Sequence, residues 1–225
     1  MISYAKLATC AIYVLDNRAV ELSVWGESQN NDEIAVVQHG SAAASDGIAT
    51  LRIHSACFTG DVLASLRCDC NAQLHASLRT VTSAPWGIII YPFAHEGRGI
   101  GLVNKLRAYN MQDSGLDTFQ ANRALGFDFD QRNYEGVVSI LRVIGADRVR
   151  LLTANPQKVA ALQRGGVTVV ETIPIEITHN DFNERYLKTK KAWFQETGSA
   201  ISSRLVRVDD NDDTRGAEPI VRGPE

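Results

Sequence analysis

Three cysteines in one short stretch limit how the middle of this chain can fold. Cys68 and Cys70 are separated by one residue, and ten residues lie between Cys57 and that pair. The spacing predicts a pocket of three thiolates that straddles strand ends and helix starts. Three protein ligands with a vacant fourth position are typical of a catalytic zinc ion. Because such an ion lowers the pKa of bound water from about 15.7 to about 7, the pattern indicates a hydrolase.

The alternative for these cysteines is an ordinary buried thiol, since free cysteine often behaves as a small hydrophobic residue. Two thiols one residue apart are too close to favour an unstrained disulfide. The charged Arg67 and Asp69 flank Cys68 and make a poor setting for an inert core position. The flanks and the spacing therefore favour metal binding. Cys10, alone near the N-terminus, is expected to be buried.

Composition narrows the class of protein. With 225 residues, 44% of them hydrophobic, the chain can bury a sizeable core as one large domain or one domain with appendages. No run of eighteen apolar residues and no secretory signal pattern is present, which favours a soluble cytoplasmic protein with reduced thiols. The net charge of -3 gives no general attraction to nucleic acid or to an anionic membrane. An anionic ligand must therefore be held by local arginines and lysines.

The hydrophobic period changes along the chain. Polar and apolar residues alternate in the opening part, which predicts antiparallel strands over Ala11–Leu15, Val20–Trp25 and Ile34–Gln38. Later segments have helical spacing or are short buried strands. The predicted helices are Gly60–Arg67, Asn71–Thr80, Asn104–Gln112, Tyr134–Ile144 and Pro156–Arg164, and the predicted strands are Trp86–Tyr91, Val149–Thr153 and Val167–Glu171.

The last strand, helix and strand of that series predict a βαβ unit. The expected fold class is therefore α+β (mixed α/β), with N-terminal antiparallel strands, a strand and helix core and a C-terminal βαβ unit. Residues 1–194 are expected to form the catalytic domain. Residues 195–225 are acidic and poor in apolar side chains, and we expect them to be disordered.

A second polar cluster, His95–Gly101, follows a predicted strand and precedes a predicted helix. Glycines there allow close approach of a ligand to the backbone, and a helix N-terminus favours anions. Glycine-rich turns are also common without a ligand. Glu96, which can accept from a guanine-type N–H edge, and Arg98, which can pair with phosphate, favour the ligand interpretation.

Each of the remaining candidate site residues could also have an ordinary structural role. Asp130 and Arg132, two residues apart in an extended loop, place their side chains on one side, but a capping Asp and a solvated Arg would have the same spacing. Tyr109 could be a helix-face core residue with a satisfied hydroxyl. Thr153 and Lys158 could hold a ligand at the mouth of the βαβ unit or merely cap a helix.

Several longer motifs occur in order between about Leu51 and Leu187. They are Arg52-Ile-His-Ser55, Cys57-Phe-Thr-Gly-Asp61, Leu66-Arg-Cys-Asp-Cys70, His95-Glu-Gly-Arg98 continuing to Lys105-Leu-Arg-Ala-Tyr109, Asp117-Thr118, Ala121-Asn122, Leu125-Gly-Phe127 and Leu151-Leu-Thr-Ala-Asn-Pro156. Together they resemble the GTP cyclohydrolase II family. The first fifty residues fit that family only in general pattern, and the acidic tail lies outside it.

The resemblance implies the first committed step of riboflavin synthesis. The family opens the imidazole ring of GTP and releases formate from C8 together with pyrophosphate. The remaining product is 2,5-diamino-6-ribosylamino-4(3H)-pyrimidinone 5′-phosphate. By the same resemblance we expect a homodimer, one Zn²⁺ per chain on Cys57, Cys68 and Cys70, and Mg²⁺ on the GTP phosphates.

The resemblance also implies individual roles. Asp130 matches the proton acceptor, and Tyr109 lines the ring-opening pocket. Arg132 matches the residue assigned as nucleophile toward the α-phosphate. Because a guanidinium is always protonated, charge stabilisation of the α-phosphoryl group is the physically favoured role. The implied GTP contacts are Arg52, Ile53, His54, Ser55, Gln73, Glu96, Gly97, Arg98, Thr118, Thr153 and Lys158.

The chain departs from the family pattern in three places. Ala56 stands where a glutamate usually precedes the first cysteine, Asn71 replaces a glycine, and Pro92-Phe93-Ala94 replaces a stretch that usually includes an arginine. With these changes, the chain could instead be a specialised paralogue that serves another pathway. Two further alternatives are a cyclohydrolase that stops at the formamide or takes a different purine nucleotide, and a non-catalytic nucleotide-binding protein. Intact Cys57 and Arg132 weigh against the last.

Overall fold

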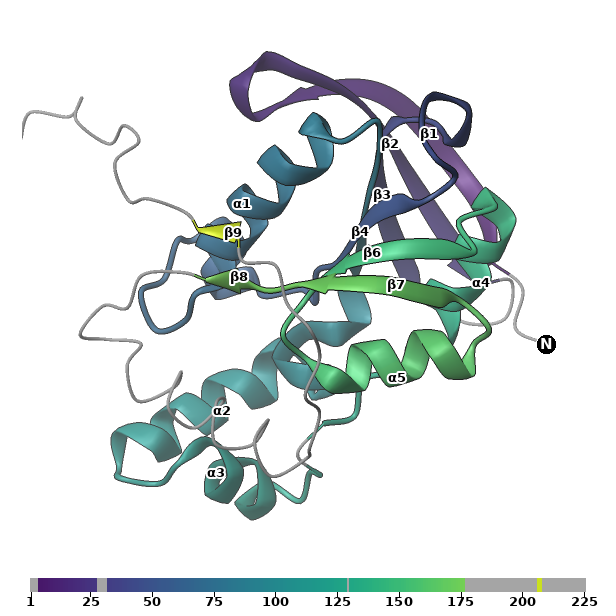
Figure 1. Ribbon diagram of the computed structural model, residues 1–225. Helices are drawn as coiled ribbons and strands as arrows, with labels where there is room; N and C mark the ends of the chain where they lie inside the picture. The colour runs from purple at the N-terminus through teal and green to yellow at the C-terminus, as the bar shows by residue number, and fades with distance from the viewer. Residues whose placement is uncertain (1–3, 28–31, 129, 177–205, 208–225) are drawn as a thin grey trace, which may run out of the picture.

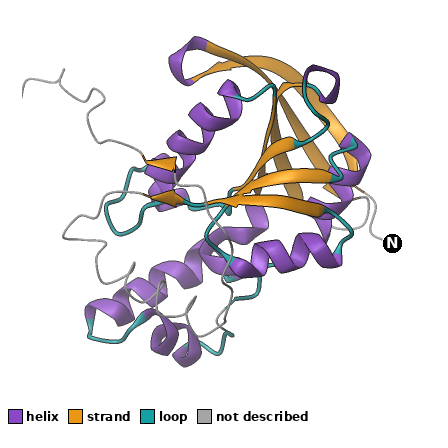
Figure 2. Cartoon of the chain, in the orientation of Figure 1, coloured by secondary structure: helices purple, strands orange, loops and turns teal. Residues whose placement is uncertain are grey.

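A seven-stranded sheet with helices on both faces forms the body of the protein (Figures 1 and 2). The computed structural model describes residues 4–27, 32–128, 130–176 and 206–207. The strands of the sheet are β1 (Tyr4–Val14), β2 (Arg18–Glu27), β3 (Glu33–Gly40), β4 (Ala49–Ile53), β5 (Trp86–Pro92), β6 (Arg148–Leu152) and β7 (Thr168–Ile173). The helices are α1 (Cys70–Ser83), α2 (Gly101–Asp113), α3 (Thr118–Ala124), α4 (Glu135–Ile144) and α5 (Pro156–Arg164).

The first three strands form the predicted antiparallel part of the sheet. β1 pairs with β2, β2 with β3, and β3 with β5, all antiparallel. β1 lies at the edge of the sheet, and most of its residues face solvent. Cys10 is therefore exposed, and the expectation that it is buried is wrong. An edge strand has a neighbour on one side only, so its side chains lack the cover that a central strand receives.

The other half of the sheet is parallel. β4 lies between β5 and β6, and β6 pairs with β7, with all three pairings parallel. Parallel neighbours need crossover connections, which α1 supplies between β4 and β5 and α5 supplies between β6 and β7. The predicted C-terminal βαβ unit is thus confirmed. Since parallel strands point the same way, the carboxyl ends of β4, β5 and β6 meet at one edge of the sheet.

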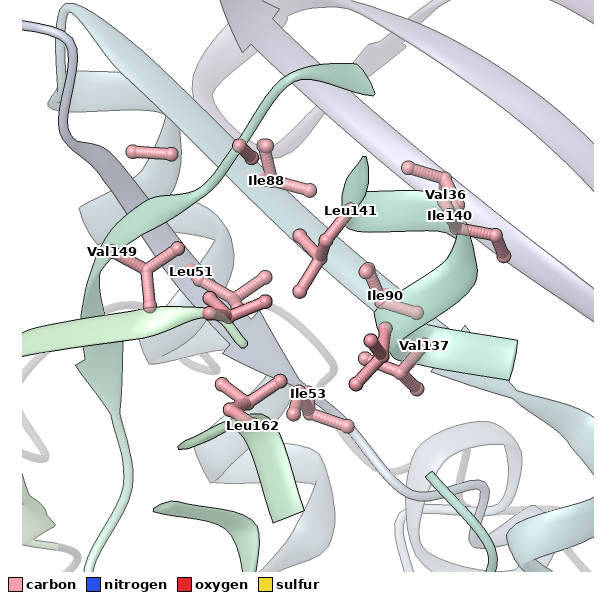
Figure 3. Close-up of a cluster of buried hydrophobic side chains, with 14 of the residues drawn as sticks. Val36, Leu51, Ile53, Ile88, Ile90, Val137, Ile140, Leu141, Val149 and Leu162 are labelled. Atoms are coloured by element: carbon pink, nitrogen blue, oxygen red, sulfur yellow. The ribbon is translucent and has the colours of Figure 1, made fainter. Parts of the chain in front are cut away.

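The sheet separates two apolar layers. Ile88 and Ile90 of β5 pack in the larger core with α4, as Figure 3 shows, whereas Ile89 between them packs with Val81 of α1 and with Leu152. Strands covered on both faces are continuous apolar runs, as β5 is. Burying one such isoleucine contributes about 1.5–3 kcal/mol to the free energy of folding. The central strands are thus a stable support for the polar residues at their carboxyl ends.

Local signals explain most helix boundaries. Gly145 has φ of 79° and ends α4, as predicted from the sequence. Asn155 caps α5 by accepting from the Gln157 amide, with Pro156 as the first helical residue.

The helix predicted over Gly60–Arg67 is wrong in extent. A single π-helical turn, η3 (Phe58–Val62), is formed instead, and Ala64 with φ of 50° redirects the chain.

A second, two-stranded sheet lies outside the main one. Ile175–Glu176 (β8) pairs in parallel with Val206–Arg207 (β9). The remaining residues of the predicted acidic tail lie outside the described residues, so its disorder stays a prediction. Within the described part of the chain, no helix has the length and apolarity that crossing a membrane requires.

Two strand glycines should respond differently to substitution by alanine. A Cβ at Gly87 of β5 would lie 2.1 Å from the Val81 carbonyl oxygen, which is backbone at the end of α1. A Cβ at Gly26 of β2 would meet only the Leu7 side chain, at 2.7 Å, and Leu7 is exposed and can rotate away. We expect Gly87→Ala to lower the free energy of unfolding in urea by about 1–3 kcal/mol. Gly26→Ala should change it by less than about 0.5 kcal/mol, and equal losses would contradict the packing of α1 on β5.

Candidate active site

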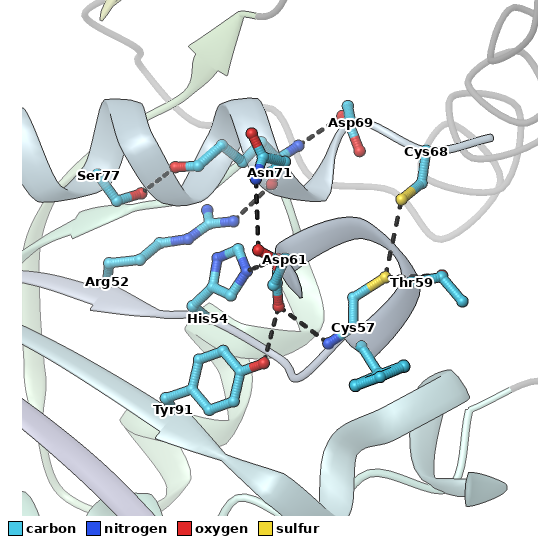
Figure 4. A network of polar contacts seen from close by, with 12 residues as sticks. Arg52, His54, Cys57, Thr59, Asp61, Cys68, Asp69, Asn71, Ser77 and Tyr91 are labelled. Carbon is cyan, nitrogen blue, oxygen red and sulfur yellow. Dashed lines mark hydrogen bonds and ion pairs between the residues drawn. The ribbon is translucent and has the colours of Figure 1, made fainter. Parts of the chain in front are cut away.

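The predicted site residues gather where the parallel strands end. His54, Ser55 and Cys57 follow β4, the irregular segment η4 (Phe93–Gly99) follows β5, and Thr153 follows β6. Ligands of sheets of this kind bind outside the carboxyl ends of the strands. Figure 4 shows the part of this edge around the cysteines.

The three predicted cysteines come together. The Sγ atoms of Cys57, Cys68 and Cys70 all lie within 4.8 Å of one another, and those of Cys57 and Cys68 are 3.7 Å apart. Gly60 makes room for them, because a Cβ on this residue would lie 2.8 Å from the Cys68 sulphur and 3.1 Å from the Cys57 sulphur. Three sulphurs that converge this closely can hold a metal ion.

A buried lysine stands next to this cluster. Lys105 of α2 donates from Nζ to the Cys57 sulphur at 3.1 Å. Hydrogen bonds from the Cys68 and Cys70 thiols, together with this ammonium group, hold the pKa of Cys57 far below its usual value. The pKa of Cys68 is raised to about 11, mainly because its thiol donates to Cys57. The cluster therefore favours a thiolate at Cys57, the charge state that a metal ligand needs.

Glu96 links the lysine to the cysteine segment. Its Oε1 accepts from Lys105 Nζ at 2.7 Å, and its Oε2 accepts from the Phe58 amide at 2.6 Å. Burial acts to lower the pKa of Lys105, but the hydrogen bonds to Glu96 and Cys57 outweigh it and raise the pKa above the ordinary value. Both Glu96 oxygens thus have protein partners, and its predicted contact with a guanine edge stays a prediction.

Sequence reasoning missed Lys105. A signal was present, because Lys105 stands four residues before Tyr109 on the same helix, and residues at that spacing share one helix face. Tyr109 itself lies beside the cluster. Its hydroxyl is 3.5 Å from Thr59 Oγ1, which lies 3.8 Å from the Cys57 sulphur, and the Arg67 guanidinium lies over its ring at 4.4 Å.

A buried carboxylate, also missed, orders the segment that carries Cys57 (Figure 4). Asp61 Oδ2 accepts from the Cys57 amide at 3.0 Å and from the Tyr91 hydroxyl at 2.8 Å. Asp61 Oδ1 accepts from His54 Nε2 at 3.0 Å. Burial lowers the pKa of His54, so the ring is neutral, and it lies stacked on Tyr91 with 5.6 Å between centroids. His54 is 2% exposed, and its implied contact with GTP stays a prediction.

Asp130 and Arg132 form the second centre. The guanidinium donates from Nε and Nη2 to the two oxygens of Asp130, and from Nη1 to Ser55 Oγ at 3.1 Å. Both side chains are about nine-tenths buried, with 9% of Asp130 and 10% of Arg132 exposed. The alternative of a solvated arginine is therefore wrong. Burial acts to raise the pKa of Asp130, but the Arg132 guanidinium lowers it overall.

The η4 segment connects the two centres. Its residues Gly97, Arg98 and Gly99 have φ of 61°, 64° and 92°, a left-handed path that glycine permits. Next to the first of them, Glu96 faces the cysteine cluster, and at the other end the Arg98 carbonyl accepts from the Gln131 amide at 3.0 Å. The predicted Gly97 and Arg98 thus lie between the sulphurs and the Arg132 loop.

Most of the other residues that we predicted to contact GTP are buried beneath the two centres. Arg52 donates to the Leu152 carbonyl at 2.8 Å and to Gln73 Oε1 at 2.5 Å, and Lys158 donates to the Ile53 carbonyl at 2.8 Å. Thr153 Oγ1 accepts from the amide of Asn155. The structure thus brings these residues to the same strand ends. Thr118 is the first residue of α3, and its contact with a ligand stays a prediction.

The three departures from the family pattern also border this region. Ala56 is buried next to Cys57, and the Asn71 side chain donates to the Asp61 carbonyl at 3.4 Å. Phe93 is 49% exposed and makes an edge contact with Tyr91 at 5.4 Å between centroids. This chain therefore has a small apolar side chain at residue 56, where the resemblance implies a glutamate, and an exposed aromatic ring in the stretch where it implies an arginine.

Comparison with known proteins gives a consistent picture. A sequence model of the GTP cyclohydrolase II family matches residues 12–174. The chain is 44% identical over 171 residues to GTP cyclohydrolase-2 of Picrophilus torridus, covering 76% of this chain and 88% of the relative. It is 45% identical over 159 residues to the enzyme of the same name from Haemophilus influenzae, covering 71% and 73%.

Among solved structures, RibBX of A. baumannii, a two-domain 3,4-dihydroxy-2-butanone 4-phosphate synthase, is similar over 78% of this chain and 41% of its own, with a TM-score of 0.41 and 17% identity. That likeness is too remote to bear on the fold or the function. The family match covers most of the described residues and spans both the cysteine cluster and the Asp130–Arg132 pair. The chain belongs to the GTP cyclohydrolase II family.

Proposed function

We propose that this chain is a GTP cyclohydrolase II that opens the imidazole ring of GTP and releases formate and pyrophosphate. The observation that carries the proposal is the joint placement of two centres at one edge of the sheet. Ser55, which accepts from Arg132, is two residues from Cys57, and η4 contacts both centres. A pure nucleotide-binding protein has no need of three converging sulphurs.

Zinc is the metal that we assign to Cys57, Cys68 and Cys70. Three thiolates leave the fourth position of a tetrahedral zinc ion to water, which matches a catalytic site, and soft thiolate ligands favour zinc over magnesium or calcium. Bound there, zinc would activate a water molecule for attack at C8 of the guanine ring. Lys105 balances part of the thiolate charge, and Glu96 holds Lys105 in place.

Arg132 and Asp130 are assigned to the phosphate end of the substrate. A guanidinium held by a carboxylate remains protonated, so Arg132 would stabilise charge that develops on the α-phosphoryl group as pyrophosphate leaves. Mg²⁺ on the phosphates would share that charge. Asp130 would act as proton acceptor, because the Arg132 guanidinium lowers its pKa and keeps the carboxylate ionised.

Tyr109 supports the complete reaction over one that stops at the formamide. Its hydroxyl lies at the cysteine cluster through Thr59, near where the C8 fragment would be attacked. The pKa of Tyr109 is raised by burial, so the hydroxyl keeps its proton and can donate to the leaving fragment. A homodimer and service in riboflavin synthesis are part of the same proposal.

The direct test is turnover of GTP by the zinc-loaded protein with Mg²⁺. We expect formate and pyrophosphate in equal amounts, together with the absorbance of a diaminopyrimidinone. Pyrophosphate without formate would point to a reaction that stops at the formamide. Release of neither product from GTP, with turnover of another purine nucleotide, would show that this chain takes a different substrate.

Gly60→Ala should weaken metal binding without removing a ligand. The new methyl group would lie within 3.1 Å of two of the three sulphurs, so they can no longer converge on one ion. We expect zinc per chain, measured by elemental analysis after dialysis against a chelator, to fall as far as in Cys68→Ser, about tenfold or more. Cys10→Ser, at an exposed position, is the control and should keep the full metal content. Retention of one zinc ion by Cys68→Ser would contradict the ligand assignment.

Arg132→Ala should stop pyrophosphate release while GTP still binds. Loss of one charge-stabilising donor typically lowers kcat by about 10²–10³-fold. Arg132→Lys keeps the charge but loses the two-point pairing with Asp130, so it should recover only a small part of the rate. Rates of pyrophosphate release and GTP affinity by calorimetry give the two readouts. Normal turnover in Arg132→Ala would show that this loop has no catalytic part.

A further inference from the structure

We propose that His95 is a positioning residue that holds the Arg132 guanidinium in place, through Ser55 and through the main chain on the C-terminal side of Arg132. The proposal rests on the assignment of Arg132 to the reaction made above. His95 is 3% exposed and is not among the residues that the family resemblance implies as ligand contacts.

The hydrogen bonds of His95 have a fixed direction. Its Nε2 lies 2.7 Å from the Asn133 carbonyl oxygen, and since a carbonyl only accepts, Nε2 carries the proton. Burial, with Arg132 and Lys158 nearby, lowers the pKa of His95 to about 4, so the ring is neutral and Nδ1 accepts. The Ser55 hydroxyl, 3.2 Å from Nδ1, must then donate to it, which leaves the Ser55 oxygen to accept from Arg132 Nη1.

The second route runs through the main chain. His95 holds the carbonyl of Asn133, immediately after Arg132, and the Arg98 carbonyl holds the amide of Gln131, immediately before it. The η4 segment is therefore hydrogen-bonded to the loop on both sides of Arg132. The His95 ring also meets the Tyr134 ring edge to face at 5.0 Å, which restricts its rotation.

Asp130 alone cannot fix the Arg132 guanidinium relative to the sheet. Asp130 belongs to the same loop as Arg132, so their two-point pairing fixes the guanidinium relative to that loop. Ser55 follows β4 and His95 follows β5, and both strands are central in the sheet. The chain Arg132–Ser55–His95 thus fixes the guanidinium relative to the sheet edge that carries the cysteines. Misplacement of a catalytic group by about 1 Å can cost about 10²-fold in rate.

Three variants separate positioning from packing. His95→Leu keeps an apolar side chain of similar size but loses both hydrogen bonds, whereas His95→Gln has one amide donor and one carbonyl acceptor to replace them. Ser55→Ala removes the link to Arg132 and leaves His95 unchanged. We expect kcat for pyrophosphate release to fall about tenfold in His95→Leu and in Ser55→Ala, with KM for GTP changed less than about threefold in His95→Leu. His95→Gln should return to within about threefold of the unsubstituted protein.

The double variant provides the strictest comparison. If His95 acts through Ser55, then adding His95→Leu to Ser55→Ala should lower kcat by much less than a further tenfold. Fully multiplicative losses would overturn the Ser55 route. A kcat in His95→Leu equal to that of the unsubstituted protein would overturn the whole proposal, provided that Arg132→Ala is inactive.

A measurement without turnover keeps this test apart from that of the proposed function. NMR of the zinc-loaded protein gives the rotation rate about the Nε–Cζ bond of Arg132, assigned by its loss in Arg132→Lys. Because Nη1 and Nη2 have different partners, rotation should be slow in the unsubstituted protein and in His95→Gln, and about fivefold or more faster in His95→Leu and Ser55→Ala. Equal rates in all of them would refute the positioning role, even if GTP proves not to be the substrate. Should His95→Leu fail to fold, His95→Met, which also lacks both hydrogen bonds, takes its place in each comparison.

Discussion

The buried carboxylate of Asp61 is the interaction on which the cysteine end of the site depends. It is surrounded by the Cys57 amide, the Tyr91 hydroxyl and the His54 ring, which come from the ends of two neighbouring strands. A buried carboxylate is costly unless such donors meet it, so the arrangement has one favourable geometry. That geometry fixes the backbone of Cys57 relative to β5. The position of the first sulphur is thus set by the sheet and not by the cysteine segment alone.

The second constraint is the η4 segment, which has to serve both centres. Three consecutive residues with positive φ turn the chain sharply enough for Glu96 to reach Lys105 while the Arg98 carbonyl reaches Gln131. The glycines at 97 and 99 are needed for this path, and at Gly99 a Cβ would also lie 3.0 Å from the Gln131 backbone. The charge at the sulphurs and the placement of Arg132 are therefore coupled through one short turn. Each centre pairs one carboxylate with one cation, Glu96 with Lys105 and Asp130 with Arg132.

The sequence allowed the antiparallel start, most helices and the βαβ unit to be predicted, because hydrophobic period and glycine or proline boundaries are local signals. It did not reveal β4, whose five residues show no alternation because both faces are covered, nor the short α3. The cysteine spacing was enough to predict the metal-binding group. The roles of Asp61, Lys105 and His95 are not evident from the sequence, since each depends in part on a partner 30 to 48 residues away. The sequence pattern around a charged residue in a turn is the same whether its side chain is solvated or buried.

The departures from the family pattern touch the surroundings of the two centres and leave their polar partners in place. Ala56 is buried, so the chain lacks a charge beside Cys57, yet Asp61 still holds that residue from the other side. Phe93 packs its edge on Tyr91, whose hydroxyl is engaged with Asp61, and therefore adds apolar surface without disturbing the hydrogen bonds. Changes of this kind alter discrimination between similar ligands by about 1–3 kcal/mol. The hydrogen bonds that order the cysteine end of the site therefore do not depend on a charged side chain at residue 56 or 93.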